Sequence, residues 1–362
     1  MNEAIRIDLP DGRGYNIQAG PIDWLPDALA EIGLQGPGCI IVTDKNVDDL
    51  YGSRLRSILH ESGWDPSTVV LPPGEETKSD QYLRRIQDRA LSAGIDRRTP
   101  LLAFGGGVTG DVGGFAAATL LRGIPLVQIP TTVIAQVDSA IGGKTGINHA
   151  VGKNLIGAFY QPRLVHVDTS LLATLPDREY RSGLAEAVKH ALIADVDLFE
   201  WIRRNWNSIL EREQTVTAEL VRRAAAIKAS VVSRDELETG LREILNFGHT
   251  FAHALELALG YGTLTHGEAV FIGMRAATFL SSHLYPDANF ERVRAFLARI
   301  DVPIVPGSVT PGRLGDAMKS DKKKRGSELR FVVLEAPGSA TVVSGVDASL
   351  VEAAWREGLG RS

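Results

Sequence analysis

Residues 101–110 read Leu-Leu-Ala-Phe-Gly-Gly-Gly-Val-Thr-Gly, a short apolar run that ends in a glycine-rich turn. Small residues dominate the next segment, 112–121, and their pattern predicts a helix. Glycines between a strand and a helix let the backbone approach a pyrophosphate, and the helix N-terminus supplies oriented N–H donors. We therefore expect a dinucleotide-binding unit here, with a tight turn that binds nothing as the alternative.

The acidic residue that would bind the ribose of such a ligand is not found at its usual place, about 20 residues after the glycines. Asp138 falls later than expected, whereas Asp44 follows an earlier apolar run and is better placed for an adenosine ribose. The sequence therefore predicts a dinucleotide-binding fold with a non-standard strand order.

Other short apolar runs alternate with segments of helical periodicity on both sides of this unit. The runs are residues 39–42, 68–71, 101–104, 126–129 and 164–167, and the helical segments include 46–62 and 80–93. Continuous apolar strands that alternate with helices predict a parallel sheet covered on both faces. Because ligands of such sheets bind beyond the carboxyl ends of the strands, the polar and turn residues after these runs are expected to line a crevice.

The two ends of the chain follow other patterns. Residues 5–9 alternate apolar and polar side chains before the turn at 10–12, which predicts an antiparallel hairpin. Helical periodicity dominates beyond Pro176, and Pro337-Gly338 separates two apolar runs, 329–334 and 340–343, as in a second hairpin. We expect an α/β N-terminal domain at 1–177 with a mainly parallel, Rossmann-like sheet, and a mainly α-helical C-terminal domain at 178–362.

Length and charge exclude several classes of protein. A chain of 362 residues is too long for a disulfide scaffold, and its net charge of -5 gives no field that would draw it onto nucleic acid or a membrane. Cys39 is the single cysteine, which fits a reducing compartment, and neither a signal peptide nor a membrane-spanning stretch is evident. We expect a cytoplasmic protein whose ligands are small molecules.

A polar stripe runs through an otherwise apolar segment, and it suggests a metal site. Arg242, Asn246, His249, His253 and Glu256 are spaced by four and three residues, as on one face of a helix. Spacing alone nominates His249 and His253 as ligands of one ion, together with a carboxylate from elsewhere, and His266 adds a third imidazole close in sequence. A pair of hydrogen-bonded histidines without a metal is the alternative.

Several lysines lie where an anion could bind. Lys144, Lys153 and Asn154 lie in a glycine-rich stretch after Asp138, which favours a phosphorylated ligand, with solvated loop lysines as the alternative. Position 138 carries Asp where a P-loop needs its first glycine, so a P-loop nucleotidase is excluded.

Glu186 and Lys189 are oppositely charged and three residues apart, so they share one face of a predicted helix with His190. A surface ion pair is the simple interpretation of these two residues.

The chain also resembles the 3-dehydroquinate synthase family over nearly its whole length. The segments that carry the resemblance are 105–114, 130–132, 136–139, 142–146, 152–162, 183–189, 241–256, 266–274 and 321–323. The resemblance implies an enzyme that binds NAD between an α/β domain and a helical domain, holds one divalent metal, usually zinc with cobalt as the alternative, and forms a homodimer.

The resemblance implies roles for individual residues. The metal ligands become Glu186, His249 and His266, and His253 becomes a proton-transfer residue instead of a ligand. The cofactor contacts are Asp44, Glu75, Lys78, Gly106, Gly107, Val108, Asp111, Thr131, Thr132, Asp138, Lys153 and Thr174. The substrate phosphate is assigned to Lys144, Asn154, Asn246 and Lys322, helped by Arg122 of the partner subunit, and the hydroxyls and carboxylate to Lys189, Lys228 and Arg242. Lys319 or Lys323 could contact the phosphate in place of Lys322. Asn148 and His149 receive no role.

The implied reaction converts 3-deoxy-D-arabino-heptulosonate 7-phosphate to 3-dehydroquinate and phosphate in the shikimate pathway. It proceeds by transient oxidation with NAD, elimination of phosphate, reduction and intramolecular aldol closure. This makes the enzyme a carbon–oxygen lyase that regenerates its cofactor. The alternatives are a sugar-phosphate cyclase of the valiolone or inosose type, a glycerol-type metal-dependent dehydrogenase, and a non-enzymatic protein that senses NAD or is stabilised by zinc.

Overall fold

The computed structural model describes residues 4–260, 262–325 and 329–361, with the backbone alone for 319–325. The chain forms two compact units. The first comprises the residues up to Pro176 together with Thr217–Leu237, and the second comprises Asp177–Val216 and the residues from Glu238 onward. A division into two domains at 177/178 stays a prediction.

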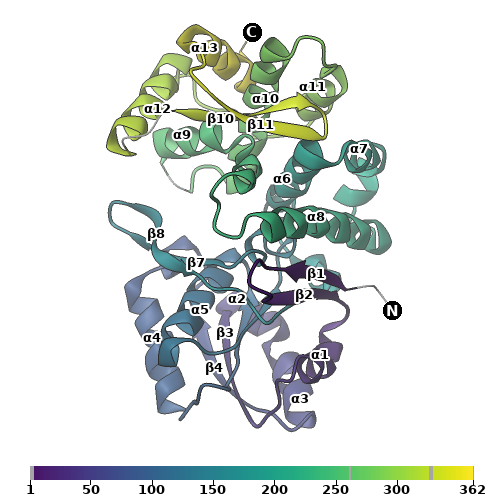
Figure 1. Ribbon diagram of the computed structural model, residues 1–362, viewed down its shortest axis with the longest axis vertical. Helices are drawn as coiled ribbons and strands as arrows, with labels where there is room; N and C mark the ends of the chain where they lie inside the picture. The colour runs from purple at the N-terminus through teal and green to yellow at the C-terminus, as the bar shows by residue number, and fades with distance from the viewer. Residues whose placement is uncertain (1–3, 261, 326–328, 362) are drawn as a thin grey trace. The chain divides into compact units, whose positions relative to one another are not determined.

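The first unit is built on a seven-stranded sheet in the order β1-β2-β9-β6-β5-β3-β4, and Figure 1 labels β1, β2, β3 and β4 of this sheet. Its strands are β1 (Ile5–Asp8), β2 (Gly14–Ala19), β3 (Gly38–Asp44), β4 (Asp65–Leu71), β5 (Leu101–Gly105), β6 (Leu126–Pro130) and β9 (Leu164–Val167). β1 pairs with β2 in antiparallel fashion, and all the other pairings in this sheet are parallel. The predicted N-terminal hairpin and the mainly parallel sheet are confirmed.

The strand order creates a switch point between β3 and β5. The chain passes from β3 outward to β4 on one side and then returns to β5 on the other side of β3. The connection after β3 runs toward β4, and the connection after β5 runs the opposite way toward β6. The two connections therefore leave a crevice at the carboxyl ends of β3 and β5, which is where ligands of doubly wound sheets bind. Asp44 ends β3 and Gly105 ends β5, so the expected non-standard order places both predicted nucleotide segments at this point.

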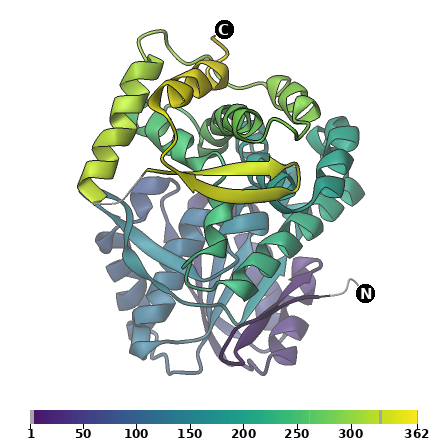
Figure 2. The ribbon, with the colours of Figure 1, turned by 45° about the horizontal axis from the view of Figure 1, so that its top comes forward.

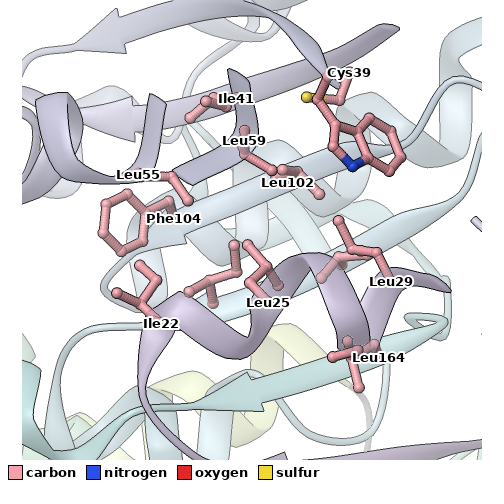
Figure 3. Packing of buried hydrophobic residues seen from close by; sticks show 14 of the residues in the cluster. Ile22, Leu25, Leu29, Cys39, Ile41, Leu55, Leu59, Leu102, Phe104 and Leu164 are labelled. Atoms are coloured by element: carbon pink, nitrogen blue, oxygen red, sulfur yellow. The ribbon is translucent and has the colours of Figure 1, made fainter. Parts of the chain in front are cut away.

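Two hydrophobic cores cover the two faces of the sheet. Ile41 packs in one core with Leu25 and Leu29 of α1 (Leu25–Glu31) and with Leu55 and Leu59 of α3 (Ser53–Glu61), as Figure 3 shows. Its strand neighbours Ile40 and Val42 point into the other core, formed with α4 (Asp80–Ser92) and α5 (Gly107–Thr119). Successive residues of β3 therefore bury both faces, which is why its sequence is continuously apolar.

Helix α5 begins at Gly107, five residues before the predicted start at Val112. Its glycines let it lie close to the sheet and the neighbouring hairpin. A Cβ atom on Gly110 would lie 2.8 Å from Oε1 of Gln128, and one on Gly114 would lie 2.5 Å from Cγ2 of Thr145. The low helix propensity of glycine is thus overridden here by close packing.

Residues 144–159, which include most of the glycine-rich stretch that carries Lys144, Lys153 and Asn154, form the antiparallel hairpin of β7 (Lys144–His149) and β8 (Gly152–Phe159). Gly146 and Gly157 face each other in the ladder, and a Cβ on Gly157 would lie 2.1 Å from the carbonyl oxygen of Thr145. Glycine is depleted in strands, so a pattern based on propensity does not find this hairpin.

Short elements complete the first unit. Residues 46–62, predicted as one helix, form α2 (Lys45–Val47), the π-helical η2 (Asp48–Gly52) and α3. The other short helices are η1 (Ile22–Trp24), η3 (Glu75–Thr77), η4 (Leu120–Arg122), η5 (Ala135–Ser139) and η6 (Thr169–Thr174). Most of α8 (Gln214–Arg234) also belongs to this unit.

The second unit is mainly helical, as predicted. Its helices are α6 (Asp177–Ala194), α7 (Val196–Leu210), η7 (Leu241–Asn246), α9 (His249–Leu259), α10 (His266–Leu284), α11 (Glu291–Ala298), α12 (Pro311–Arg325) and α13 (Ala348–Gly358). The predicted hairpin consists of β10 (Arg330–Ala336) and β11 (Ser339–Ser344), and it packs on α10 (Figure 2). Among the described residues, no helix combines the length and apolar character needed to cross a membrane.

The polar stripe from Arg242 to Glu256 is not one helix face, which corrects the spacing argument. The 3₁₀ helix η7 ends at Asn246, and α9 starts afresh at His249 after Gly248 adopts a left-handed backbone with φ of 81°. A side chain at position 248 would also meet the backbone of α10, since its Cβ would lie 2.9 Å from the nitrogen of Met274. Only His249, His253 and Glu256 therefore share a continuous helix.

Candidate active site

Three side chains of the second unit bring metal-binding atoms together. Glu186 lies in the middle of α6, and His249 and His266 are the first residues of α9 and α10. Nε2 of His249 lies 3.6 Å and Nε2 of His266 lies 3.3 Å from Oε1 of Glu186. The three ligand atoms all lie within 4.8 Å of one another.

This spacing suits a tetrahedral ion. In a zinc site with bonds of about 2.0–2.2 Å, simple geometry separates two ligand atoms by about 3.3–3.6 Å. Both distances to Oε1 of Glu186 fall in that interval. Two imidazoles and one carboxylate are also a donor set that zinc and other first-row divalent ions accept, and three protein ligands leave one position open, as in catalytic sites. The residues present therefore fit a divalent metal.

Neighbouring groups orient each of these three side chains. Lys189 lies one turn along α6 and donates to Oε2 of Glu186, so the other oxygen faces the imidazoles. Nδ1 of His249 lies 3.3 Å from the carbonyl oxygen of Phe247. Nδ1 of His266 lies 3.8 Å from Oε1 of Glu256. Contacts at Nδ1 direct Nε2 of both rings toward Glu186, which is the usual arrangement around a metal.

The two imidazoles have opposite electrostatic surroundings. Burial lowers the pKa of His249 well below its ordinary value, against the attraction of Glu186. Burial acts in the same direction on His266, but the neighbouring carboxylates of Glu186 and Glu256 outweigh it and raise its pKa to about 9. The carboxylates therefore concentrate negative charge at the side of the cluster where His266 lies.

The remaining predicted residues of the second unit lie on the segments next to this cluster. Arg242 in η7 is buried, and Nδ2 of Asn246 lies 3.4 Å from Oε1 of Glu238. The ring of His253 meets that of His249 edge to face, with centroids 5.6 Å apart. Lys322 lies in α12 and its side chain, like those of Lys319 and Lys323, is outside the described residues.

The predicted nucleotide residues of the first unit gather at the ends of its parallel strands. Gly106 is the N-cap of α5, a 13-residue helix whose first turn receives no side-chain cap. Asp44 uses Oδ1 to accept from the backbone N–H groups of Asn46 and Val47, at 3.0 and 3.2 Å, and burial raises the pKa of its carboxyl. The backbone N–H of Thr131 donates to the carbonyl of Gly105 at 3.0 Å, which fixes the end of β6 beside that of β5.

A buried lysine organises a second group in this unit. Nζ of Lys78 donates to Oδ2 of Asp111 at 2.6 Å and to Oδ1 of Asn154, and it lies 3.9 Å from Oε1 of Glu75. Burial raises the pKa of Asp111 despite the charge of Lys78. Glu75, Lys78 and Asp111, which were predicted as cofactor contacts, are therefore in one contact network with Asn154, which was predicted to bind the substrate phosphate.

A second ion pair joins Nζ of Lys228 on α8 to Oδ1 of Asp138, at 2.6 Å. Lys228 is buried, and both residues belong to the first unit. Thr132 accepts a hydrogen bond from the backbone of Ala135, and Oγ1 of Thr174 lies 2.7 Å from the hydroxyl of Tyr51. Lys144 is the exposed first residue of β7, Lys153 is half-buried on β8, and Arg122 is exposed at the end of η4.

Comparison with known proteins identifies the family of this chain. Residues 68–182 match the N-terminal domain and residues 183–324 the C-terminal domain of 3-dehydroquinate synthase. The chain belongs to the 3-dehydroquinate synthase family. A 3-dehydroquinate synthase of Salinibacter ruber is 50% identical over 355 residues, which cover 98% of this chain and 96% of the relative.

Solved structures of two other cyclases resemble this member of the 3-dehydroquinate synthase family. The 2-epi-5-epi-valiolone synthase of Streptomyces hygroscopicus, with NAD⁺ and Zn²⁺ bound, has a TM-score of 0.86 at 30% identity and covers 96% of this chain and 97% of its own. A 2-deoxy-scyllo-inosose synthase complexed with carbaglucose-6-phosphate, NAD⁺ and Co²⁺ has a TM-score of 0.84 at 28% identity, and covers 99% of this chain and 100% of its own.

Two residues of these networks were not predicted to have a role in the site. Glu256 appeared only as part of the polar stripe, and its contact with His266 depends on the approach of α9 to α10, which spacing does not reveal. Asn148 received no role, although its side chain contacts Glu75 and the backbone of Asn154. Its place between two segments with predicted ligands was the one signal available.

Proposed function

We propose that this enzyme is a 3-dehydroquinate synthase, which converts 3-deoxy-D-arabino-heptulosonate 7-phosphate to 3-dehydroquinate and phosphate with NAD and one divalent metal. The observation that carries the proposal is the cluster of Glu186, His249 and His266, whose spacing fits a tetrahedral ion. The 50% identity to a 3-dehydroquinate synthase over nearly the whole chain supports the choice of substrate.

The metal would be held by Glu186, His249 and His266, with zinc as the expected ion and cobalt as the alternative. When bound there, a divalent ion supplies Lewis acidity, which stabilises negative charge on substrate oxygens. Lys189 holds Glu186 from the side opposite the imidazoles, so the carboxylate is fixed before the substrate arrives. His253 follows one turn after His249 on α9, and we assign it the transfer of a substrate hydroxyl proton.

The nucleotide would bind at the switch point of the sheet. NAD supplies a hydride acceptor that returns the hydride before the product leaves. The N-terminus of α5 at Gly106, Gly107 and Val108 would bind its pyrophosphate, because the first N–H groups of a helix have no partners within the helix. Asp44 would accept from the ribose, with Glu75, Lys78, Asp111, Thr131, Thr132, Asp138, Lys153 and Thr174 as the other proposed contacts.

The substrate carries a phosphate and a carboxylate, so cations must gather locally in a chain with a net charge of -5. Lys144, Asn154, Asn246 and Lys322 are proposed for the phosphate, and Lys189, Lys228 and Arg242 for the hydroxyls and carboxylate. Asp138 fixes the ammonium group of the buried Lys228, and this ion pair would orient the lysine toward the substrate. Arg122 would reach the phosphate from the partner subunit of a homodimer. A cytoplasmic location stays a prediction.

The decisive experiment follows phosphate and NADH at the same time. The protein is incubated with the heptulosonate phosphate, NAD and zinc, and the expected result is one phosphate per carbocyclic product without net NADH formation. Treatment with a chelator should abolish turnover, and added zinc or cobalt should restore it.

Three other outcomes would overturn the proposal, and each points to a different alternative. Accumulation of NADH with a polyol would indicate a metal-dependent dehydrogenase. Preferred turnover of a sugar phosphate without a carboxylate would indicate a cyclase of the valiolone or inosose type. Binding of NAD and metal without any phosphate release would indicate a non-enzymatic protein.

A further inference from the structure

Asn148 connects two segments that carry proposed ligands. It lies near the end of β7, and its side-chain Nδ2 donates to Oε1 of Glu75 at 2.8 Å. Its Oδ1 accepts from the backbone N–H of Asn154 at 2.9 Å, and its own backbone N–H donates to the carbonyl of Lys78 at 2.8 Å. One side chain and one peptide group therefore join the turn at Glu75–Thr77 to the β7–β8 hairpin.

We propose that Asn148 is a positioning residue that couples the nucleotide-binding turn at Glu75 and Lys78 to the phosphate-binding Asn154. The inference rests on the proposed function for the roles of those three residues. Asn148 itself contacts neither ligand in this assignment, and it acts through the side chain of Glu75 and the backbone of Asn154.

The conformation of Asn154 shows why it needs such support. Its φ of 56° lies in the left-handed region, which asparagine tolerates better than most residues but which still needs surrounding contacts to hold it. Asn148 binds its N–H, and Lys78 donates to its side-chain Oδ1. With Oδ1 directed at Lys78, the NH₂ group of Asn154 is the part of the amide that can donate to a phosphate.

The amide of Asn148 is suited to its two neighbours because it donates and accepts at once. A carboxylate would keep the acceptor for Asn154 but would face Glu75 across 2.8 Å with a like charge. A methyl group would offer neither bond. Asn148→Ala and Asn148→Asp should therefore have different effects on NAD binding and on the Asn154 amide. A side chain that only fills space would not produce this difference.

The test uses Asn148→Ala, Asn148→Asp, Glu75→Gln and the double variant Asn148→Asp with Glu75→Gln. Val151→Ala is the control, because that side chain lies 81% exposed at the tip of the same hairpin. The readouts are hydrogen exchange at the backbone amide of Asn154, the dissociation constant for NAD by calorimetry, and kcat and KM for the sugar phosphate.

Asn148→Ala should remove the exchange protection of the Asn154 amide and raise both the dissociation constant for NAD and the KM by about tenfold to a hundredfold, the usual effect of losing hydrogen bonds to charged or buried groups. Asn148→Asp should retain the protection but weaken NAD binding more than alanine does. Adding Glu75→Gln to Asn148→Asp should restore binding relative to Asn148→Asp alone, because the introduced amide can donate to the introduced carboxylate. Val151→Ala should match the wild type in all three measurements.

Unchanged protection of Asn154 in Asn148→Ala would overturn the inference, as would additive effects in the double variant. If Asn148→Ala does not fold, the comparison of Asn148→Asp with the double variant decides alone. Hydrogen exchange and the dissociation constant for NAD are measured without substrate. They therefore test the positioning role of Asn148 even if the wild type releases no phosphate. Absence of phosphate release by the wild type would instead contradict the proposed function.

Discussion

Gly248 and Gly273 meet backbone to backbone where α9 begins against α10. A Cβ atom on Gly273 would lie 2.1 Å from the carbonyl oxygen of Gly248. This approach sets the first turn of α9 against α10, and the rings of His249 and His266 have centroids 5.2 Å apart. The glycine pair therefore helps to position two of the three proposed metal ligands.

Gly248→Ala should destabilise the protein more than an alanine at an otherwise similar glycine. Its left-handed backbone costs a side chain about 1–3 kcal/mol, and the contact of the new Cβ with the backbone at Met274 adds about 1–3 kcal/mol. Metal affinity should fall as well, because His249 is the next residue. Urea unfolding and titration with zinc measure the two effects.

Gly260→Ala is the matched control for this prediction. Gly260 ends the same helix with φ of 82°, but a Cβ there would meet nothing within 4 Å. Only the backbone strain remains, about 1–3 kcal/mol at its φ of 82° and ψ of 138°, and zinc affinity should not change. An equal loss of zinc affinity in the two variants would show that the contact between α9 and α10 does not position His249.

Metal content should separate His249 from His253. His249→Ala removes one of three ligands and should lower zinc affinity by a hundredfold or more, a larger loss than that caused by changing an outer-shell partner. His253→Ala should retain one equivalent of metal while turnover slows, because its proposed role is proton transfer. Elemental analysis after dialysis gives the metal content, and phosphate release gives the rate.

His283→Ala controls for the loss of an imidazole from the same unit, since His283 is exposed in the last turn of α10. It should match the wild type in metal content and rate. Loss of metal in His253→Ala to the same extent as in His249→Ala would refute the division of roles.

The sheet could be predicted from the sequence because burial of both faces requires strands with uninterrupted apolar runs. Residues such as Ile40 and Ile41 point into opposite cores, so a strand of a covered parallel sheet must be apolar without interruption. The end of each apolar run then marks the carboxyl edge of the sheet. Asp44 and the glycines after residue 104 were placed at the crevice by this argument alone.

The site could be predicted only in part, because its groups meet through tertiary contacts. Spacing shows that His249 and His253 share a helix, but it cannot show that α6 brings Glu186 to His249, and that ligand came from the family resemblance. The left-handed turn at Gly248 also broke the assumed helical stripe. Asn148 has no signature beyond its place between two segments with predicted ligands, since its role depends on contacts with Glu75 and Asn154.

The thiol of Cys39 should respond to pH only through unfolding. It is buried in β3, and burial raises its pKa from 9.0 to about 12. A group whose folded pKa is raised contributes full stability below its unfolded pKa, and the contribution is lost as pH rises toward the folded value. Between pH 9 and 12 the wild type should lose about 1.4 kcal/mol per pH unit more than Cys39→Ala.

Urea unfolding of the two proteins at several alkaline pH values measures this difference. A thiol reagent at pH 8 should leave the folded protein unmodified and should label one thiol per chain after denaturation. Parallel pH profiles for the wild type and Cys39→Ala, or rapid labelling of the folded protein, would contradict the burial of this side chain.

Arg122 lies in a strained turn that suggests a functional position. Leu121 and Arg122 have φ values of 50° and 66°, although neither is glycine. Arg122→Gly should relieve strain and be more stable than Arg122→Ala by about 1 kcal/mol. Both variants remove the guanidinium group, so both should lower kcat/KM by about a hundredfold, the scale of a charge-assisted contact with phosphate. Equal stability, or activity retained in the glycine variant, would contradict this interpretation.

Mixing two inactive variants tests whether Arg122 acts across a dimer. A subunit with Arg122→Ala keeps its own Glu186, and a partner with Glu186→Ala still supplies Arg122, so one site of each mixed dimer is complete. When equal amounts of the two variants are mixed, about half of the dimers are mixed after random exchange, and one of their two sites is complete, so activity should recover to about a quarter of the wild type. If Arg122 serves the site of its own subunit, no mixed dimer contains a complete site and activity should stay at the level of the separate variants. Size-exclusion chromatography with light scattering checks that mixed dimers form, and a monomeric mass for the wild type would exclude the exchange mechanism outright.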